Sequence, residues 1–170
     1  MSDGITLRTS LLSEYDDEIA ITRRLLDRLT DSAFAWKPHD RSMSLGDLAT
    51  HLANIPRWGA SILGRDTYDL ERDHTASTAN LPSRAEVLST FNRHAAEARQ
   101  ALVGRTDAEL VAPWSLLRDG ELVMSLPRAT AVRRFLLNHL VHHRGQLTVY
   151  LRMQNVPLPP LYGPSADERM

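Results

Sequence analysis

The sequence predicts an all-α protein, a four-helix bundle with a long crossover connection between its second and third helices. Three observations lead to this prediction. Apolar residues recur at helical spacing in four long segments, a polar stretch at 64–81 separates the second segment from the third, and two segments follow Ser-x-x-acidic N-caps. The chain has 170 residues, enough for a substantial core, and we expect residues 1–170 to form one domain.

Composition limits the classes of partner. The formal net charge of −1 provides no bulk attraction to nucleic acid or to an anionic membrane, so we expect neither as a partner. The chain has no Cys, which excludes disulfides, a protein thiol nucleophile and thiolate ligands, and fits the cytosol. The N-terminus lacks the basic and apolar regions of a secretion signal, and no apolar run approaches the ~20 residues that span a bilayer. We therefore expect a cytoplasmic protein.

The first helix is expected at about 7–29. Its apolar residues share one face, while acidic and arginine side chains cover the other, as is typical of a solvated surface helix. The connection at 31–43 contains Trp36, which we expect to cover one end of the bundle. Pro38 disfavours helical backbone at Lys37 and so helps to keep this connection non-helical.

The second helix is expected at 45–63, with Ser44 as its N-cap and Asp47 in the capping-box position. Asp47 also lies one turn before His51, so it could instead accept a hydrogen bond from the His51 ring. Capping alone is the simpler interpretation. Pro56 lies inside this helix and is expected to kink it.

The stretch 64–81 is predicted to be a long crossover loop, in which His74 has no apolar neighbours and is expected to be exposed. The third helix begins after Ser83, which forms a capping box with Glu86, and ends at Gly104. His94 adjoins apolar residues of this helix. It is therefore a further candidate for an inward-facing ligand.

A short capped turn at 106–110 and a β-hairpin at 113–127 precede the fourth helix; the Asp119–Gly120 pair between apolar runs indicates the hairpin turn. The fourth helix is expected at about 128–153, followed by a Pro-rich extended tail at 156–170. A second apolar patch on this helix predicts a subunit contact, and hence a homodimer, through residues away from its main stripe. These are Leu137, Val141 and Val149.

Two histidines lie inside the main apolar stripe of the fourth helix. His139 and His143 are four residues apart, so their Cβ atoms lie roughly 6 Å apart on one face. A single His on such a face is usually a core residue with one hydrogen bond, but two in one stripe must each find a polar partner in a dry interior. Two imidazoles placed in this way can converge on one metal ion. His142 lies nearer the edge of the stripe, and Arg144 lies on the opposite side.

The second helix offers a third ligand, His51, on the same side as its apolar residues. Together with His139 and His143 it would make an all-nitrogen site, which suits Zn, Ni, Cu or Fe. Three protein ligands leave positions open for water or substrate, as in a catalytic site. The pattern differs from the zincin motif because Leu140 stands where that motif carries its Glu base, and the sequence identifies no catalytic residue.

Four long helices, a long second connection and this His spacing resemble the DinB-like (YfiT-like) family of metal-binding four-helix bundles. The resemblance rests on the segments 44–53 and 138–146, and the tail 161–168 is similar to the ending of one bacterial branch. It implies that His51, His139 and His143 bind a divalent metal, with Zn or Ni expected, and that the protein is a homodimer. Some members are S-transferases or isomerases that use a low-molecular-weight thiol.

Two functions of different classes follow. In the first, the protein is a metal- and thiol-dependent S-transferase on a small-molecule substrate, in which the ion lowers the pKa of an external thiol. A hydrolase variant would use metal-bound water instead. In the second, the protein is a non-catalytic metal-binding protein of stress response or ligand binding. Strong stabilisation by metal would favour a structural ion over a catalytic one.

Overall fold

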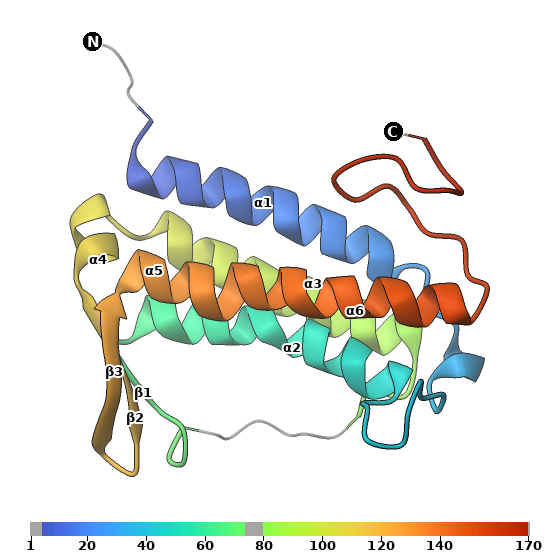
Figure 1. Cartoon of the computed structure of the whole chain (residues 1–170). Helices are drawn as coiled ribbons and strands as arrows, with labels where there is room; N and C mark the ends of the chain where they lie inside the picture. The colour runs from blue at the N-terminus through green and yellow to red at the C-terminus, as the bar shows by residue number, and fades with distance from the viewer. Residues whose placement is uncertain (1–4, 74–79, 170) are drawn as a thin grey trace.

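The computed structural model describes residues 5–73 and 80–169, and four long helices dominate it (Figure 1). The last of them is continuous but contains a π-helical segment, Arg133–Leu137, between two α-helical parts. The long helices are α1 (Leu7–Leu26), α2 (Leu45–Gly64), α3 (Arg84–Val103) and the joined pair α5 (Arg128–Val132) and α6 (Asn138–Met153). Within the described residues, no helix combines the length and the apolar character needed to cross a membrane.

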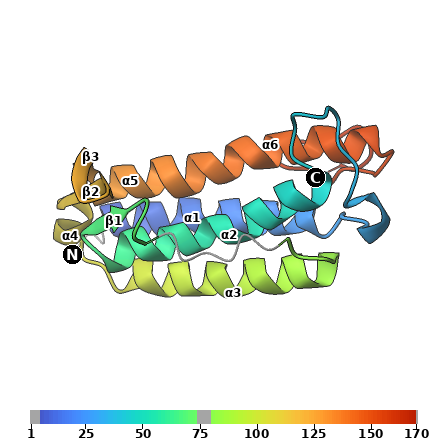
Figure 2. The same cartoon turned by 90° about the horizontal axis from the view of Figure 1, so that it is seen from below.

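The helices α1 and α5–α6 run in one direction and α2 and α3 in the other (Figures 1 and 2). Consecutive helices that run in the same direction need a connection that returns along the bundle. The chain between Gly64 and Arg84 makes this return, which confirms the predicted long crossover. His74 lies outside the described residues, so its predicted exposure is untested.

The predicted N-caps Ser44, Ser83 and Thr106 are present, and Thr6, which we did not predict, caps α1; each side chain accepts a backbone hydrogen bond. The capping box at Ser44 is complete, whereas at Ser83 only the hydrogen bond from the Glu86 amide is formed. The short helix α4 (Asp107–Val111) replaces the predicted capped turn. Buried apolar side chains come from all four long helices, and α2 contributes most of its length to the core. Its burial explains why a helix with so few charged residues is stable here.

A small sheet lies at the end of the bundle where α2 finishes and α5 begins (Figure 1). The predicted hairpin is formed by β2 (Pro113–Arg118) and β3 (Glu121–Pro127), and both turn residues have positive φ, 51° at Asp119 and 86° at Gly120. The sequence did not predict the third strand, β1 (Thr67–Asp69), which pairs in parallel with β2. The crossover is therefore partly a strand, and the protein is mostly helical with a three-stranded sheet.

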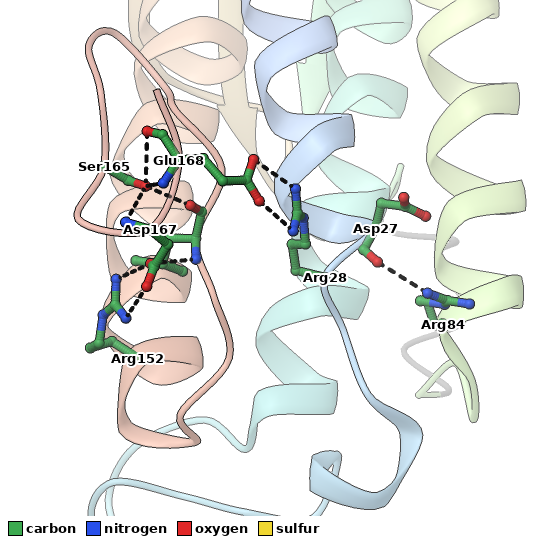
Figure 3. A network of polar contacts seen from close by, with 8 residues as sticks. Asp27, Arg28, Arg84, Arg152, Ser165, Asp167 and Glu168 are labelled. Carbon is green, nitrogen blue, oxygen red and sulfur yellow. Dashed lines mark hydrogen bonds and ion pairs between the residues drawn. The ribbon is translucent and has the colours of Figure 1, made fainter. Parts of the chain in front are cut away.

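The C-terminal tail after Met153 was predicted to be extended; it has no regular secondary structure and folds back along α6 and α1. Ion pairs hold it there: Asp167 with Arg152 of α6, and Glu168 with Arg28 just after α1 (Figure 3). The Ser165 hydroxyl accepts hydrogen bonds from the backbone amides of Asp167 and Glu168 and so closes the final turn.

Candidate metal centre

His51 lies on the buried side of α2, one turn after the capping box. Leu48, Leu52 and Ile55 share this side and are nearly inaccessible to solvent, so packing of the helix carries the imidazole toward α6. Asp47 does not reach the His51 ring. Its carboxylate accepts hydrogen bonds from the Ser44 amide at 3.0 Å and from the Asn80 side chain, which confirms the capping interpretation.

His139 and His143 follow the π-helical segment Arg133–Leu137 on the last long helix. A π-helical turn inserts extra backbone into a helix and shifts the side chains after it, and such turns are frequent at functional sites. The neighbouring α2 packs closely at this level, because a Cβ at Gly59 would lie 2.5 Å from Leu136 Cδ2. Gly59 thus permits the close approach of the two helices that carry the three imidazoles.

The structure brings the three predicted residues together. The Nε2 atoms of His51 and His139 are 3.1 Å apart, and one ring nitrogen from each of His51, His139 and His143 lies within 4.8 Å of the others. The ring centroids are 4.4–4.9 Å apart, and all three side chains are partly buried. Among the described residues, these three side chains form the group of His, Asp or Glu residues whose ligand atoms lie close enough together to bind one metal ion.

The cluster favours neutral imidazoles. Burial, followed by the neighbouring His143 and His139, lowers the pKa of His51 from 6.5 to about 4. Burial is also the main cause that lowers the pKa of His139 and of His143. A neutral ring keeps a nitrogen lone pair, so each of the three can act as a metal ligand near pH 7.

Two groups orient the rings on α6. His143 Nδ1 lies 2.7 Å from Gln146 Oε1, and the Phe135 carbonyl accepts a hydrogen bond from the His139 ring. Such contacts fix the tautomer and leave the other ring nitrogen for an ion. We did not predict a role for Gln146 from the sequence. Its position three residues after His143, one turn along the helix, could have indicated that the two side chains are in contact.

The two other candidate histidines, His94 and His142, do not belong to the metal-binding group. His94 is buried on α3, and its Nδ1 lies 3.0 Å from the Ala53 carbonyl oxygen, so it is a core residue with one hydrogen bond. His142 is exposed and contacts the amide of Gln146 at 3.3 Å. The proposal that His94 is a further ligand therefore finds no support in the geometry.

Known proteins resemble this chain over nearly its whole length. The sequence model of the DinB family matches residues 1–169. YrdA of Bacillus subtilis (strain 168), described as an uncharacterized protein, is 28% identical over 159 residues, which cover 92% of this chain and 89% of YrdA.

Two solved structures share the fold. A DinB-like protein from Bacillus cereus has a TM-score of 0.66 and 22% identity, with 89% of this chain and 95% of that chain covered. The DinB-like protein YjoA from Bacillus subtilis has a TM-score of 0.71 and 16% identity, with 95% and 99% covered. The four-helix arrangement is thus common to these proteins.

Proposed function

Since this chain belongs to the DinB family, we propose that His51, His139 and His143 hold one divalent ion, Zn²⁺ or Ni²⁺. We further propose that the protein is a metal- and thiol-dependent S-transferase acting on a small molecule. The observation that carries the proposal is the convergence of three neutral imidazoles from two helices in a partly buried site.

The donor set fits such an ion. Zn–N distances are about 2.0–2.1 Å, so two nitrogens on one tetrahedral ion lie roughly 3.3 Å apart. The His51–His139 separation of 3.1 Å and the 4.8 Å limit for the whole cluster lie on either side of this value. Small rotations of the rings would therefore complete the site, and imidazole nitrogen is a ligand that both Zn²⁺ and Ni²⁺ accept.

Three neutral ligands leave the ion its full charge and open positions; when bound, it would lower the pKa of a thiol held there. The thiol must come from outside, because the chain contains no Cys. The protein's own residues hold the rings in place: Gln146 orients His143, and the Phe135 carbonyl orients His139. Partial burial of the cluster limits water around the transferring group.

Turnover with a panel of low-molecular-weight bacterial thiols and an electrophilic acceptor tests the proposal. The metal-loaded protein should conjugate the thiol, and chelation or His51→Ala should abolish conjugation. His39→Ala removes an exposed imidazole outside the cluster and should leave turnover unchanged. Turnover with water but no thiol would indicate the hydrolase variant.

A protein that binds metal but turns over neither thiol nor water would support the alternative, a non-catalytic metal-binding or ligand-binding protein. The visible spectrum of the Co²⁺- or Ni²⁺-substituted protein separates these cases, because a coordinated thiol changes it. If no thiol changes the spectrum, the transferase proposal fails.

We also propose a homodimer through α6. Val141 and Val149 are exposed on this helix, at 36% and 57%, whereas Leu137 is already buried within the chain at 5%. A partner subunit would cover the two valines. Light scattering of the Val141→Arg variant should show monomers, and a wild-type protein that is monomeric at micromolar concentration would contradict the proposal.

A further inference from the structure

A polar pocket lies between α2 and α3, along the first half of α3. Its volume is about 430 Å³, within the range of roughly 300–1,000 Å³ that small-molecule sites occupy. Asn54 and Arg57 of α2 line one side of it, and residues 80–82 border it just before α3 begins. Figure 2 shows α2 between α6 and α3, so the pocket is on the other side of α2 from the three imidazoles.

The helix α3 lines the pocket with a row of polar side chains. Glu86, Thr90, His94 and Glu97 are four, four and three residues apart, so they follow one another on the same face of the helix. Glu86 does not complete the capping box at Ser83, so its carboxylate remains available to the pocket. The row therefore provides hydrogen-bonding groups along the length of the pocket.

His94 is the buried member of this row, and only one of its ring nitrogens has a partner among the described residues. The side chain is 5% exposed, and Nδ1 lies 3.0 Å from the Ala53 carbonyl oxygen. Among the described residues, Trp114 Nε1 is the side-chain atom that is both sealed from solvent and without a partner. His94 Nε2 is not sealed in this way, and the pocket that its ring lines gives access to it.

The free nitrogen of His94 is a hydrogen-bond acceptor near pH 7. A carbonyl oxygen can only accept, so the proton of the neutral ring is on Nδ1 and the lone pair is on Nε2. Burial is the main cause that lowers the pKa of His94, and the ring therefore stays neutral. A molecule that pairs with Nε2 must bring an O–H or N–H group.

The charges around the pocket balance. Two arginines and two glutamates line it, Arg57, Arg93, Glu86 and Glu97, and Arg93 is 3.8 Å from Glu97. The pocket thus has no formal charge that would select an anion or a cation. Among the described residues, His94 also belongs to no group of three side chains that could hold a metal ion.

Two neutral groups beside His94 complete the hydrogen-bonding pattern. Asn54 Nδ2 donates to the Thr50 carbonyl oxygen at 2.9 Å, which leaves its Oδ1 as an acceptor. The Thr90 hydroxyl, one turn before His94, can both donate and accept. Neighbouring hydroxyl groups of a ligand, each of which donates and accepts, match this combination.

We propose that the pocket binds an uncharged polyhydroxy molecule of the size of a monosaccharide, with one of its hydroxyl groups donating to His94 Nε2. Adjacent hydroxyl groups bond to Asn54 Oδ1 and to the Thr90 hydroxyl. This site is separate from the metal centre and does not depend on the proposed function.

Three uncharged polyols, glucose, galactose and myo-inositol, test the proposal. The chain has seven His residues, and long-range proton–nitrogen NMR spectra report the hydrogen bonding of each ring nitrogen. At least one polyol should shift the His94 Nε2 signal and leave the signals of the metal cluster unchanged. The fully O-methylated form of that polyol has no donor and should bind at least about tenfold more weakly. A His94 signal that none of the three polyols changes would overturn the inference.

Charged relatives of glucose test the class of ligand. Glucuronate carries one negative charge and protonated glucosamine one positive charge. Because the charges of the pocket balance, neither should bind more than about fivefold more tightly than glucose. A larger gain with either one would overturn the assignment to uncharged molecules.

Substitutions separate the free nitrogen from the rest of His94. In His94→Asn the side-chain amide can still donate to the Ala53 carbonyl, but Nε2 is lost, so affinity for the polyol should fall about tenfold. His39→Asn is the matched control, because His39 is an exposed residue in the connection before α2, and affinity should be unchanged. Equal affinity of wild type and His94→Asn would contradict the proposal. If His94→Asn does not fold, Thr90→Val, which should weaken binding severalfold, and the His94 signal of the wild type decide.

The same titrations on metal-free protein and on His51→Ala distinguish this proposal from the proposed function. Polyol binding should persist in both, within about twofold, because the pocket and the imidazole cluster are on different sides of α2. Polyol binding without any thiol transfer would support the pocket and contradict the transferase. Thiol transfer by a protein whose His94 signal no polyol changes would support the transferase and overturn the present inference.

Discussion

On one side of α6, His139 and His143 face His51 of α2; on the other side, Arg144 faces Glu18 and Thr22 of α1. Arg144 is 1% exposed, yet its charge and its donors are satisfied inside the chain. It forms an ion pair with Glu18 at 2.5 Å and donates to the Thr22 hydroxyl at 3.0 Å and to the Tyr162 hydroxyl. Among the described residues, no carboxylate plays this part for the His cluster.

The comparison distinguishes buried polar residues that stabilise the fold from buried polar residues that can bind a ligand. Around Arg144, α1 and the tail supply the polar atoms, so the cluster is complete without a ligand. Around His51, burial favours the neutral form of three imidazoles, and their ring nitrogens lie close together. A bound cation would give these nitrogens the partner that the chain itself does not supply. The first arrangement stabilises the fold, and we propose that the second binds metal.

Arg144→Met removes the central residue of the cluster formed with Glu18, Thr22 and Tyr162, and it should have the largest effect on stability. It leaves the Glu18 carboxylate, 17% exposed, without its ion pair, and removal of one partner of a buried pair costs about 3–5 kcal/mol. Urea denaturation measures the loss. Arg99→Met is the matched control because Arg99 of α3 pairs with Asp16 of α1 on the surface, where an ion pair contributes little, and it should cost far less than Arg144→Met. Equal losses would contradict the distinction.

Gly59→Ala tests the helix contact that holds the metal site. The new Cβ would meet Leu136 Cδ2 at 2.5 Å in the core, so we expect a loss of about 2 kcal/mol and weaker metal binding as α2 moves away. Gly145→Ala is the comparison, since nothing lies within 4 Å of its new Cβ and alanine favours helix. It should raise stability by up to about 1 kcal/mol; a loss there comparable to that of Gly59→Ala would contradict the account.

Tyr162→Phe tests the contribution of the C-terminal tail to the Arg144 cluster. The Tyr162 hydroxyl donates to the Glu18 carboxylate at 2.8 Å and accepts from Arg144, so its removal should cost about 1.5 kcal/mol. Metal affinity should be unchanged because the tail contacts the opposite side of α6. Thermal unfolding and metal titration of the same sample measure both; weakened metal binding would show that the two sides of the helix are coupled.

The smallest effect concerns pH and the metal-free His cluster. The pKa of His51 is about 4 in the folded state and 6.5 in its unperturbed state, so the unfolded chain takes up the proton first as the pH falls. Stability should therefore decrease from pH 6.5 to about 4, by about 1 kcal/mol after allowance for solvent screening. His51→Ala should make this decrease smaller without abolishing it, because burial also lowers the pKa of His139 and of His143. A metal-free wild type with the same pH profile as His51→Ala would show that the ring is not shielded.

The long helices and the three clustered histidines could be predicted because both depend on local spacing. Apolar periodicity located the helices, although α1 ends at Leu26 rather than near 29. The spacing of His139 and His143 on one face and the position of His51 on the inner side of α2 identified the candidates. That the two helices face each other was implied by the resemblance to the DinB-like family. The hairpin followed from Asp119 and Gly120, whose positive φ angles such residue types tolerate.

Features that depend on distant parts of the chain could not be predicted. The strand β1 has three residues, and its pairing with β2 is set by the packing of the hairpin rather than by its own composition. The sequence places Arg144 opposite the histidines, but its complete burial requires Glu18 and Tyr162, from α1 and the tail. The π-helical segment Arg133–Leu137 likewise has no local signal that distinguishes it from α-helix.

Metal stoichiometry tests the central claim most directly. Metal-free protein would be titrated with Zn²⁺ and with Ni²⁺ by calorimetry, and the metal retained after gel filtration measured by elemental analysis. We expect about one equivalent for the wild type and for His39→Ala, and essentially none for His51→Ala, His139→Ala or His143→Ala, because two imidazoles alone hold an ion weakly. Full retention of one equivalent by all three cluster variants would contradict the account.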